Sequence, residues 1–200
     1  MRVIAGAYRS RILKSLKGLA LRPTSDRLRE TLFNVLGPAV SGARFLDLFA
    51  GTGAIGIEAL SRGATEVVFI ESHVPAAKLI RQNLEALEIR SGFTVMAIDA
   101  LRGLATLVSR ELPSRPGFDC IFLDPPYDAA EEYSRVLEFL GTVELLGPGG
   151  IVVAEHRRNF GLCEEAGALK RFRVLKQGDA ALSFYRRRSG EAGGEKKPAE

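Results

Sequence analysis

The sequence has few of the side chains that build metal centres and disulfides. Among its 200 residues there are two cysteines, Cys120 and Cys163, and two histidines, His73 and His156. Two cysteines cannot form a disulfide framework or a four-ligand zinc site, and neither histidine has Cys or His partners at ligand spacing. We therefore expect no metal, and the sequence has no candidate hydrolytic triad. Cys120 lies in an apolar run, where it would pack as a small hydrophobe.

Long apolar segments are also absent. No apolar run approaches the roughly 18 residues of a membrane-spanning helix, and residues 1–9 lack the apolar core of a signal peptide. We expect a cytoplasmic protein without membrane contact. Hydrophobic residues make up 46% and charged residues 26% of the chain, which is the balance of a soluble globular protein. The length suits one domain with a small appendage.

The net charge of +4 hides an uneven distribution. Residues 1–30 hold eight basic and two acidic side chains, residues 31–155 hold nine and sixteen, and residues 156–200 hold eleven and six. The three segments therefore carry +6, −7 and +5. Basic ends around an acidic centre indicate a polyanionic partner bound outside the central fold, with solvated surface charge as the alternative.

The central part of the chain alternates between strand-like and helix-like segments. Short apolar and β-branched runs predict strands at 44–49, 66–71, 93–99, 118–124 and 150–155. Apolar residues at helical spacing predict helices at 54–62, 75–88, 100–111 and 129–140. Continuous apolar strands separated by helices indicate an α/β fold, in which helices cover both faces of a parallel sheet.

After Glu155 the pattern changes. Two strand-like runs at 171–176 and 181–186, separated by a turn around Gly178-Asp179, predict a hairpin. This C-terminal antiparallel hairpin would complete a mostly parallel, seven-stranded sheet.

Before the central part, apolar and basic residues alternate within residues 1–22 and predict a small β-hairpin. Thr24-Ser25-Asp26 is typical of a helix N-cap, and the helix that follows would stop at Gly37-Pro38. The chain thus divides into an N-terminal extension of hairpin plus helix (1–40), a main domain (41–186) and a disordered tail (187–200).

A glycine loop follows the first predicted strand. Gly51-Thr52-Gly53-Ala54-Ile55-Gly56 fits the G-x-G-x-x-G pattern between a strand and a helix. Glu71, at the end of the second strand, can accept both hydrogen bonds of a ribose diol. Asp99-Ala100, after the third strand, can bind an adenine amine or can simply cap a helix. These features fit NAD and S-adenosylmethionine (SAM) equally.

Asp47 favours SAM. It lies four residues before Gly51 in an otherwise apolar strand, where an unpaired carboxylate would be costly. A pyrophosphate would repel it, whereas the ammonium and the cationic sulfur of SAM would attract it. The alternative is that Asp47 caps a helix or a turn.

Asp124-Pro125-Pro126-Tyr127 ends the fourth strand. The two prolines cannot continue the strand ladder, so a carboxylate, a free carbonyl and an aromatic ring are placed at the carboxyl end of the sheet. The Asp124 carboxylate and the Pro125 carbonyl can accept the two N–H bonds of an exocyclic amine and free its lone pair to attack a methyl group. Tyr127 can stack on the base, and a base within folded RNA or a duplex must be flipped out first. The alternative is a simple strand-ending turn.

Together these motifs resemble those of class I, amino-directed SAM-dependent methyltransferases. More narrowly, the chain resembles the RsmD family, bacterial enzymes that methylate N2 of a guanine in small-subunit (16S) ribosomal RNA. The similarity extends over residues 1–186 and is carried by Arg22-Pro23-Thr24, Asp26-Arg27, residues 47–64 and residues 122–127. The chain departs from the family pattern at Ser10, where a second glycine is usual, and at Thr52, where serine is commoner.

The resemblance implies a Rossmann-like class I methyltransferase fold, SAM as cofactor, and 16S rRNA or the small ribosomal subunit as partner. We expect a monomer. The candidate catalytic residues are Asp124, Pro125, Pro126 and Tyr127. The candidate cofactor-binding residues are Asp47, Phe49, Ala50, Gly51, Gly53, Glu71, Ser72, Asp99 and Ala100.

The resemblance further implies that a basic N-terminal arm holds RNA phosphates around the target. Its candidate RNA-binding residues are Arg2, Arg9, Arg11, Lys14, Arg22, Thr24 and Arg27. Arg22 and Thr24 would lie closest to the pocket, and several such contacts would make binding steeply salt-dependent. For each arginine, a solvated surface position is the alternative.

Three other functions remain open at this stage. A DNA adenine-N6 or protein glutamine methyltransferase uses a similar loop, but often has asparagine at the position of Asp124, and the chain has no second domain for reading DNA. A NAD-dependent oxidoreductase would need an acid at the hydride site, and none is evident. A nucleic-acid-binding module with a vestigial pocket is the third. The sequence identifies neither the target nucleotide nor whether naked RNA or an assembled particle is the substrate.

Overall fold

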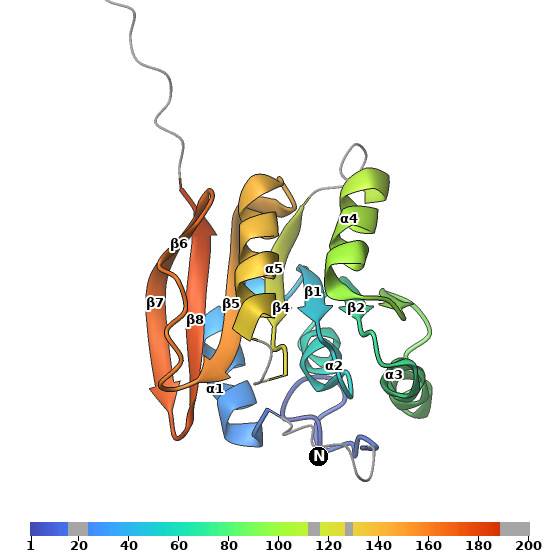
Figure 1. Cartoon of the computed structure of the whole chain (residues 1–200). Helices are drawn as coiled ribbons and strands as arrows, with labels where there is room; N and C mark the ends of the chain where they lie inside the picture. The colour runs from blue at the N-terminus through green and yellow to red at the C-terminus, as the bar shows by residue number, and fades with distance from the viewer. Residues whose placement is uncertain (16–23, 112–116, 127–129, 189–200) are drawn as a thin grey trace, which may run out of the picture.

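The computed structural model of the protein describes residues 1–15, 24–111, 117–126 and 130–188. In this part of the chain, a mixed sheet lies between two layers of helices (Figure 1). The strands are β1 (Arg44–Leu48), β2 (Glu66–Ile70), β3 (Phe93–Met96), β4 (Phe118–Leu123), β5 (Leu146–Arg157), β6 (Glu165–Ala166), β7 (Leu169–Gln177) and β8 (Ala180–Arg187). The helices are α1 (Asp26–Leu36), α2 (Ala54–Ser61), α3 (Val74–Ala86), α4 (Ala100–Glu111) and α5 (Ala130–Thr142), with a 3₁₀ turn, η1 (Gly37–Val40), after α1.

The order of strands in the sheet is β3-β2-β1-β4-β5-β8-β7-β6. Pairing is parallel from β3 to β5 and antiparallel from β5 to β6. The chain therefore reverses its progress across the sheet between β1 and β4, and ligands of open α/β sheets bind at the carboxyl ends of the strands beside such a switch point. The expected Rossmann-like fold, mostly parallel with a C-terminal antiparallel hairpin, is confirmed.

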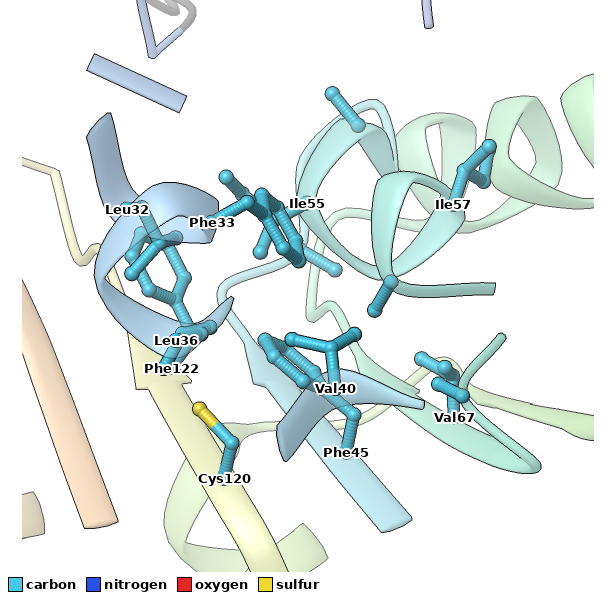
Figure 2. Close-up of a cluster of buried hydrophobic side chains, with 14 of the residues drawn as sticks. Leu32, Phe33, Leu36, Val40, Phe45, Ile55, Ile57, Val67, Cys120 and Phe122 are labelled. Atoms are coloured by element: carbon cyan, nitrogen blue, oxygen red, sulfur yellow. The ribbon is translucent and has the colours of Figure 1, made fainter. Parts of the chain in front are cut away.

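Each face of the sheet encloses its own core. Because successive side chains of a strand point to opposite faces, β1 gives Phe45 to one core and Leu46 to the other. Helices α1, α2 and α3 cover the first face, where the rings of Phe45 and Phe33 stack at 6.3 Å (Figure 2). Cys120 packs in the same core, and burial raises the pKa of its thiol. Helices α4 and α5 cover the second face.

The sheet differs from the expected one at its C-terminal side. It has eight strands because the two-residue β6 pairs with β7, and two residues are too few to leave an alternating pattern. Strand β5 begins at Leu146 instead of residue 150, since its start forms a bulge against β4, where Pro148 needs no partner for an N–H. Strand β8 includes Arg187, and residues 189–200 of the expected tail lie outside the described part.

The N-terminal segment forms a minimal antiparallel pair. Arg2 and Ile12 make an isolated bridge, and the Val3 N–H donates to the Arg11 carbonyl at 2.9 Å. Residues 16–22 of the expected hairpin lie outside the described residues. Helix α1 begins as predicted, with the Ser25 hydroxyl accepting the Leu28 N–H at 3.2 Å.

Candidate active site

The glycine loop between β1 and α2 adopts a backbone conformation that favours glycine. Gly51 and Gly53 have φ values of +55° and +79°. Phe49 also lies in this region, with φ of +59°, although it carries a side chain; such strain is typical of ligand-binding sites. The Ala50 N–H donates to the Ile70 carbonyl at 3.1 Å, so the loop is tied to the end of β2.

Glu71 follows β2 and supports this loop. Its Oε2 accepts the Gly51 N–H at 2.7 Å, and its Oε1 accepts the His73 N–H at 2.8 Å. The carboxylate is buried, and each of its oxygens has a second lone pair. Glu71 can therefore hold the glycine loop and still accept hydrogen bonds from a ribose diol. Ser72, beside it, is exposed.

Asp47 is buried in β1 and reaches the first turn of α2. Its Oδ2 accepts the Gly56 N–H at 2.9 Å, a donor that has no partner within the helix. Asp47 therefore does cap helix α2, as the alternative interpretation proposed. A carboxylate has two oxygens, so it can cap a helix and bind a ligand at the same time. Burial raises the pKa of Asp47 to about 7, with the negative charge of Glu71 adding to the effect. A bound cation would favour the charged form and reverse this shift.

Asp124 and Glu155 lie side by side at the carboxyl ends of β4 and β5, which pair in parallel. The Thr24 hydroxyl donates to Glu155 Oε2 at 2.7 Å. Burial, followed by the charges of Glu155 and Asp47, raises the pKa of Asp124 well above its usual range, while the Thr24 hydroxyl lowers it. The side chains of Asp124, Glu155 and Asp47 thus form one electrostatically linked group at this edge of the sheet.

Glu155 is a residue that the sequence analysis used only to mark the end of a strand. Its side chain is buried, and its backbone carbonyl accepts the Tyr133 hydroxyl at 2.7 Å, which fixes the end of β5. A signal existed: Glu155 is a carboxylate at the end of an apolar parallel strand, as Asp47, Glu71 and Asp124 are. A carboxylate with both Asp124 and Thr24 beside it belongs in the list of candidate site residues.

The remaining candidates lie near this edge or outside the described residues. Pro125 is buried and Pro126 is exposed, while Tyr127 lies outside the described part of the chain. Asp99 is exposed, and its Oδ1 accepts the Leu101 N–H at 3.0 Å, so it caps α4, which begins at Ala100. The helix-cap alternative for Asp99 is what the structure displays.

The arm residues have mixed placements. Arg2, Arg9, Lys14 and Arg27 are exposed, and Arg22 lies outside the described residues. Arg11 donates from Nη2 to the Ala86 carbonyl at 2.8 Å and so caps the last turn of α3. Thr24 bonds to Glu155 instead of facing solvent alone, which places the start of α1 against the carboxylates of the site.

Buried Glu58 of α2 anchors the arm, which the sequence analysis did not recognise. Its two oxygens accept the N–H groups of Ile4 at 2.7 Å and Ala5 at 3.0 Å, and Arg62 Nε lies 2.7 Å from Oε1. Fully buried Arg29 lies alongside, with Nε 3.9 Å from Glu58 Oε2. A charged residue in an otherwise apolar helix was the signal for this network.

The described residues contain no group of three or more His, Cys, Asp or Glu side chains placed to hold a metal ion. None of the described helices is long and apolar enough to cross a membrane. His156 is buried, with Nε2 2.9 Å from the Ser183 hydroxyl, and burial lowers the pKa of its imidazole.

The chain is similar to proteins of a known family. Residues 1–186 match the family model described as Conserved hypothetical protein 95. The protein named ribosomal RNA small subunit methyltransferase D from Escherichia coli is 33% identical over 197 residues, covering 98% of this chain and 92% of that protein. The protein of the same name from Haemophilus influenzae is 32% identical over 188 residues, covering 93% and 92%. The chain belongs to the RsmD family of SAM-dependent methyltransferases.

Solved structures agree with this membership. The Escherichia coli yhhF structure is 28% identical, has a TM-score of 0.79, and covers 94% of this chain and 98% of that chain. SMU.776, solved with S-adenosylhomocysteine, is 14% identical with a TM-score of 0.63 over 80% of this chain and 48% of that chain, and shows the shared fold alone.

The residues at the carboxyl edge fit the cofactor of this family. SAM carries an ammonium group, a cationic sulfur, a ribose diol and an adenine. Buried Asp47 and Glu71 supply negative charge and hydrogen-bond acceptors, and the glycine loop lets the backbone come close to a ligand. An acidic edge of this kind suits a cationic cofactor and would repel a pyrophosphate.

Proposed function

We propose that this methyltransferase transfers the methyl group of SAM to N2 of a guanine in small-subunit ribosomal RNA. The observation that carries the proposal is the position of Asp124 and Pro125 at the end of β4, beside β1, whose Asp47 acts electrostatically on Asp124. The names of the Escherichia coli and Haemophilus influenzae relatives support an rRNA substrate. We also propose that the protein works in the cytoplasm.

The chemistry requires an activated amine, because the lone pair of an exocyclic amine is delocalised into the ring. In the proposed reaction, the Asp124 carboxylate and the Pro125 carbonyl accept the two N–H bonds and aim the lone pair. When bound, SAM supplies an electrophilic methyl group on a cationic sulfur. The Asp124 carboxylate would also accept the proton that the methylated nitrogen releases.

Binding divides between two sets of residues. Asp47, Glu71 and the glycine loop would hold the cofactor. Tyr127 would stack on the flipped base, and the exposed arm residues Arg2 and Arg9 would bind phosphates. Glu155 would position Asp124 through its charge and through Thr24, without touching substrate.

The test is a direct one. Purified protein with labelled SAM should methylate 16S rRNA or small subunits from a strain that lacks it, and nucleoside mass analysis should find N2-methylguanosine. Asp124→Ala should lose nearly all transfer while retaining cofactor binding, and Glu144→Ala, which removes an exposed carboxylate between α5 and β5, should behave as the wild type. N6-methyladenosine, methylated protein, or an active Asp124→Ala variant would contradict the proposal.

A further inference from the structure

The antiparallel end of the sheet presents a basic surface that the proposed chemistry does not use. We call it the β7–β8 patch and define it by Lys170, Phe172, Arg173, Arg186 and Arg188. These residues lie on β7 and β8, or directly after β8, beyond the strands that the helices cover most closely (Figure 1). They belong to the +5 C-terminal segment of the sequence.

The patch faces the same side of the sheet as α1. The Phe172 ring lies 6.2 Å from the ring of Phe184, which packs in the core on that side. Lys170 pairs with Arg186 across the two strands, and Arg173 pairs with Phe184, so these side chains share that face. A register shift between Arg171 and Arg173 places Phe172 in a bulge, and bulges re-aim side chains.

Two features of the β7–β8 patch are unfavourable for the stability of the fold. Phe172 is 46% exposed, although it is large and apolar. Lys170 and Arg186 are like charges directly opposite each other, which is an unfavourable cross-strand pair. Among the described residues, the carboxylate that pairs with the patch is Glu165, which contacts Lys170 at 3.6 Å and also Arg188.

Two arginines are therefore left for a partner. Arg186 places its guanidinium carbon 4.2 Å from the Phe172 ring centroid, and Arg173 lies 6.0 Å from that of Phe184. Within the described chain, neither has a carboxylate within ion-pair distance. The close ring contact restricts the Arg186 guanidinium while its N–H groups can still donate, and a guanidinium can bind phosphate with two parallel hydrogen bonds.

An exposed aromatic ring flanked by basic side chains, as Phe172 is here, is typical of surfaces that bind single-stranded nucleic acids. Every base has a face that can stack on phenylalanine, and arginine binds the flanking phosphates. An acidic peptide would use the cations but would leave Phe172 without a matching group. Charge and ring together therefore favour RNA.

The patch is within reach of an RNA engaged at Asp124. Glu155 pairs with Leu182 of β8, which pairs with Leu175 of β7, so these residues mark the level of the site on the antiparallel strands. Arg186 lies four residues beyond Leu182 on β8, which is about 13 Å at a rise of ~3.3 Å per residue. Strand β8 is two strands away from β4, which is about 10 Å at a spacing of ~4.8 Å between strands. Folded RNA easily spans that separation.

We propose that the β7–β8 patch is a second RNA-docking surface, on which an unpaired base stacks on Phe172 while Arg173 and Arg186 bind the neighbouring phosphates. The inference rests on the proposed RNA substrate. It adds a binding surface on the opposite end of the sheet from the N-terminal arm.

The experiment measures binding and turnover separately. Binding of the full-length protein to a 16S rRNA fragment and to whole small subunits is measured at several salt concentrations for Phe172→Ala and for Arg173→Ala/Arg186→Ala. Arg135→Ala, which removes an exposed arginine on α5, on the opposite face of the sheet from the patch, is the matched control. Arg186→Lys keeps the charge and loses the planar stack.

For the RNA fragment we expect Phe172→Ala to weaken binding about fivefold or more. The double variant should lower the salt dependence of log Kd by about one to two units, at ~0.7–0.9 per lost phosphate contact. KM for RNA should rise, whereas kcat and cofactor affinity should stay as in the wild type. The RNA affinity of Arg186→Lys should lie between those of the wild type and the double variant.

Other outcomes separate this inference from the proposed function. If the wild type methylates rRNA but the patch variants bind RNA as the wild type does, the patch proposal is wrong and the function stands. If they weaken binding to small subunits alone, the patch docks a ribosomal protein, which also overturns the proposal. If the wild type binds RNA through the patch but yields no N2-methylguanosine, the proposed function is the part that fails.

Discussion

Replacing Glu155 with glutamine tests the electrostatics of the candidate site. The Thr24 hydroxyl can still donate to the glutamine oxygen, so the change removes a charge and preserves shape. After burial, Glu155 is the largest cause of the raised pKa of Asp124. Removing that charge should therefore bring the pKa of Asp124 down toward its ordinary value, because the repulsion between the two buried carboxylates disappears.

The raised pKa of Asp124 sets the direction in which Glu155→Gln changes activity and stability. In the proposed reaction Asp124 must be ionised to accept the N–H bonds of the amine, so its raised pKa would limit activity on the acid side. Glu155→Gln should therefore move the acid limb of the pH–rate profile to lower pH. A carboxyl whose pKa is raised by folding destabilises the fold above its ordinary pKa, so Glu155→Gln should also raise the melting temperature at pH 8 and change it little near pH ~3.

The assay is single-turnover methyl transfer between pH 4 and 9, with thermal unfolding followed over the same range. Glu144→Gln, which removes an exposed carboxylate, should leave both curves unchanged. An acid limb that stays in place or moves to higher pH, or a variant less stable at pH 8 than the wild type, would refute the reasoning that Glu155 acts through the Asp124 carboxyl.

Two further predictions concern the N-terminal segment. Ser10 has φ of +67°, a region that favours glycine, so Ser10→Gly should stabilise the fold by up to ~1 kcal/mol in urea unfolding. The control Ser41→Gly, at φ of −69°, should destabilise the fold. Equal effects of the two substitutions would contradict the argument that Ser10 is strained. Glu58→Gln should cost about 3 kcal/mol, at the lower end of the range for breaking a buried ion pair, because buried Arg29 loses one charge partner and keeps Asp26. It should also speed hydrogen exchange at the Ile4 and Ala5 amides. Unchanged protection of those amides would mean that Glu58 does not anchor the arm.

The parts of the fold that were predictable have local causes. The apolar run of β1 and the N-cap Ser25 act within a few residues, so their patterns survive in the sequence. The bulge at the start of β5 and the two-residue β6 depend on pairing with β4 and β7, and no local pattern encodes that. The same holds for Glu58, whose partners Ile4 and Ala5 are more than fifty residues away in the chain.

The candidate site divides in the same way. Asp47, Glu71 and Asp124 stand at strand ends next to glycine and proline motifs, where their chemistry can be inferred from neighbours in the chain. Glu155 has no motif, and its importance arises from the parallel pairing that brings it beside Asp124 and from the Thr24 hydroxyl. Spatial proximity of this kind requires the sheet order β1-β4-β5, which sequence patterns do not specify.

The carboxylates at the carboxyl edge of the sheet suit a cationic cofactor and, in the proposed reaction, a neutral amine beside it. Glu71 repels Asp47 and Glu155 repels Asp124, and burial adds to the energy of the ionised forms of Asp47 and Asp124. A bound cation near Asp47 lowers that energy and favours the ionised form of its neighbours, including Asp124. In the proposed reaction the ionised Asp124 accepts the N–H bonds of the base, so binding of the methyl donor would also prepare the group that orients the methyl acceptor.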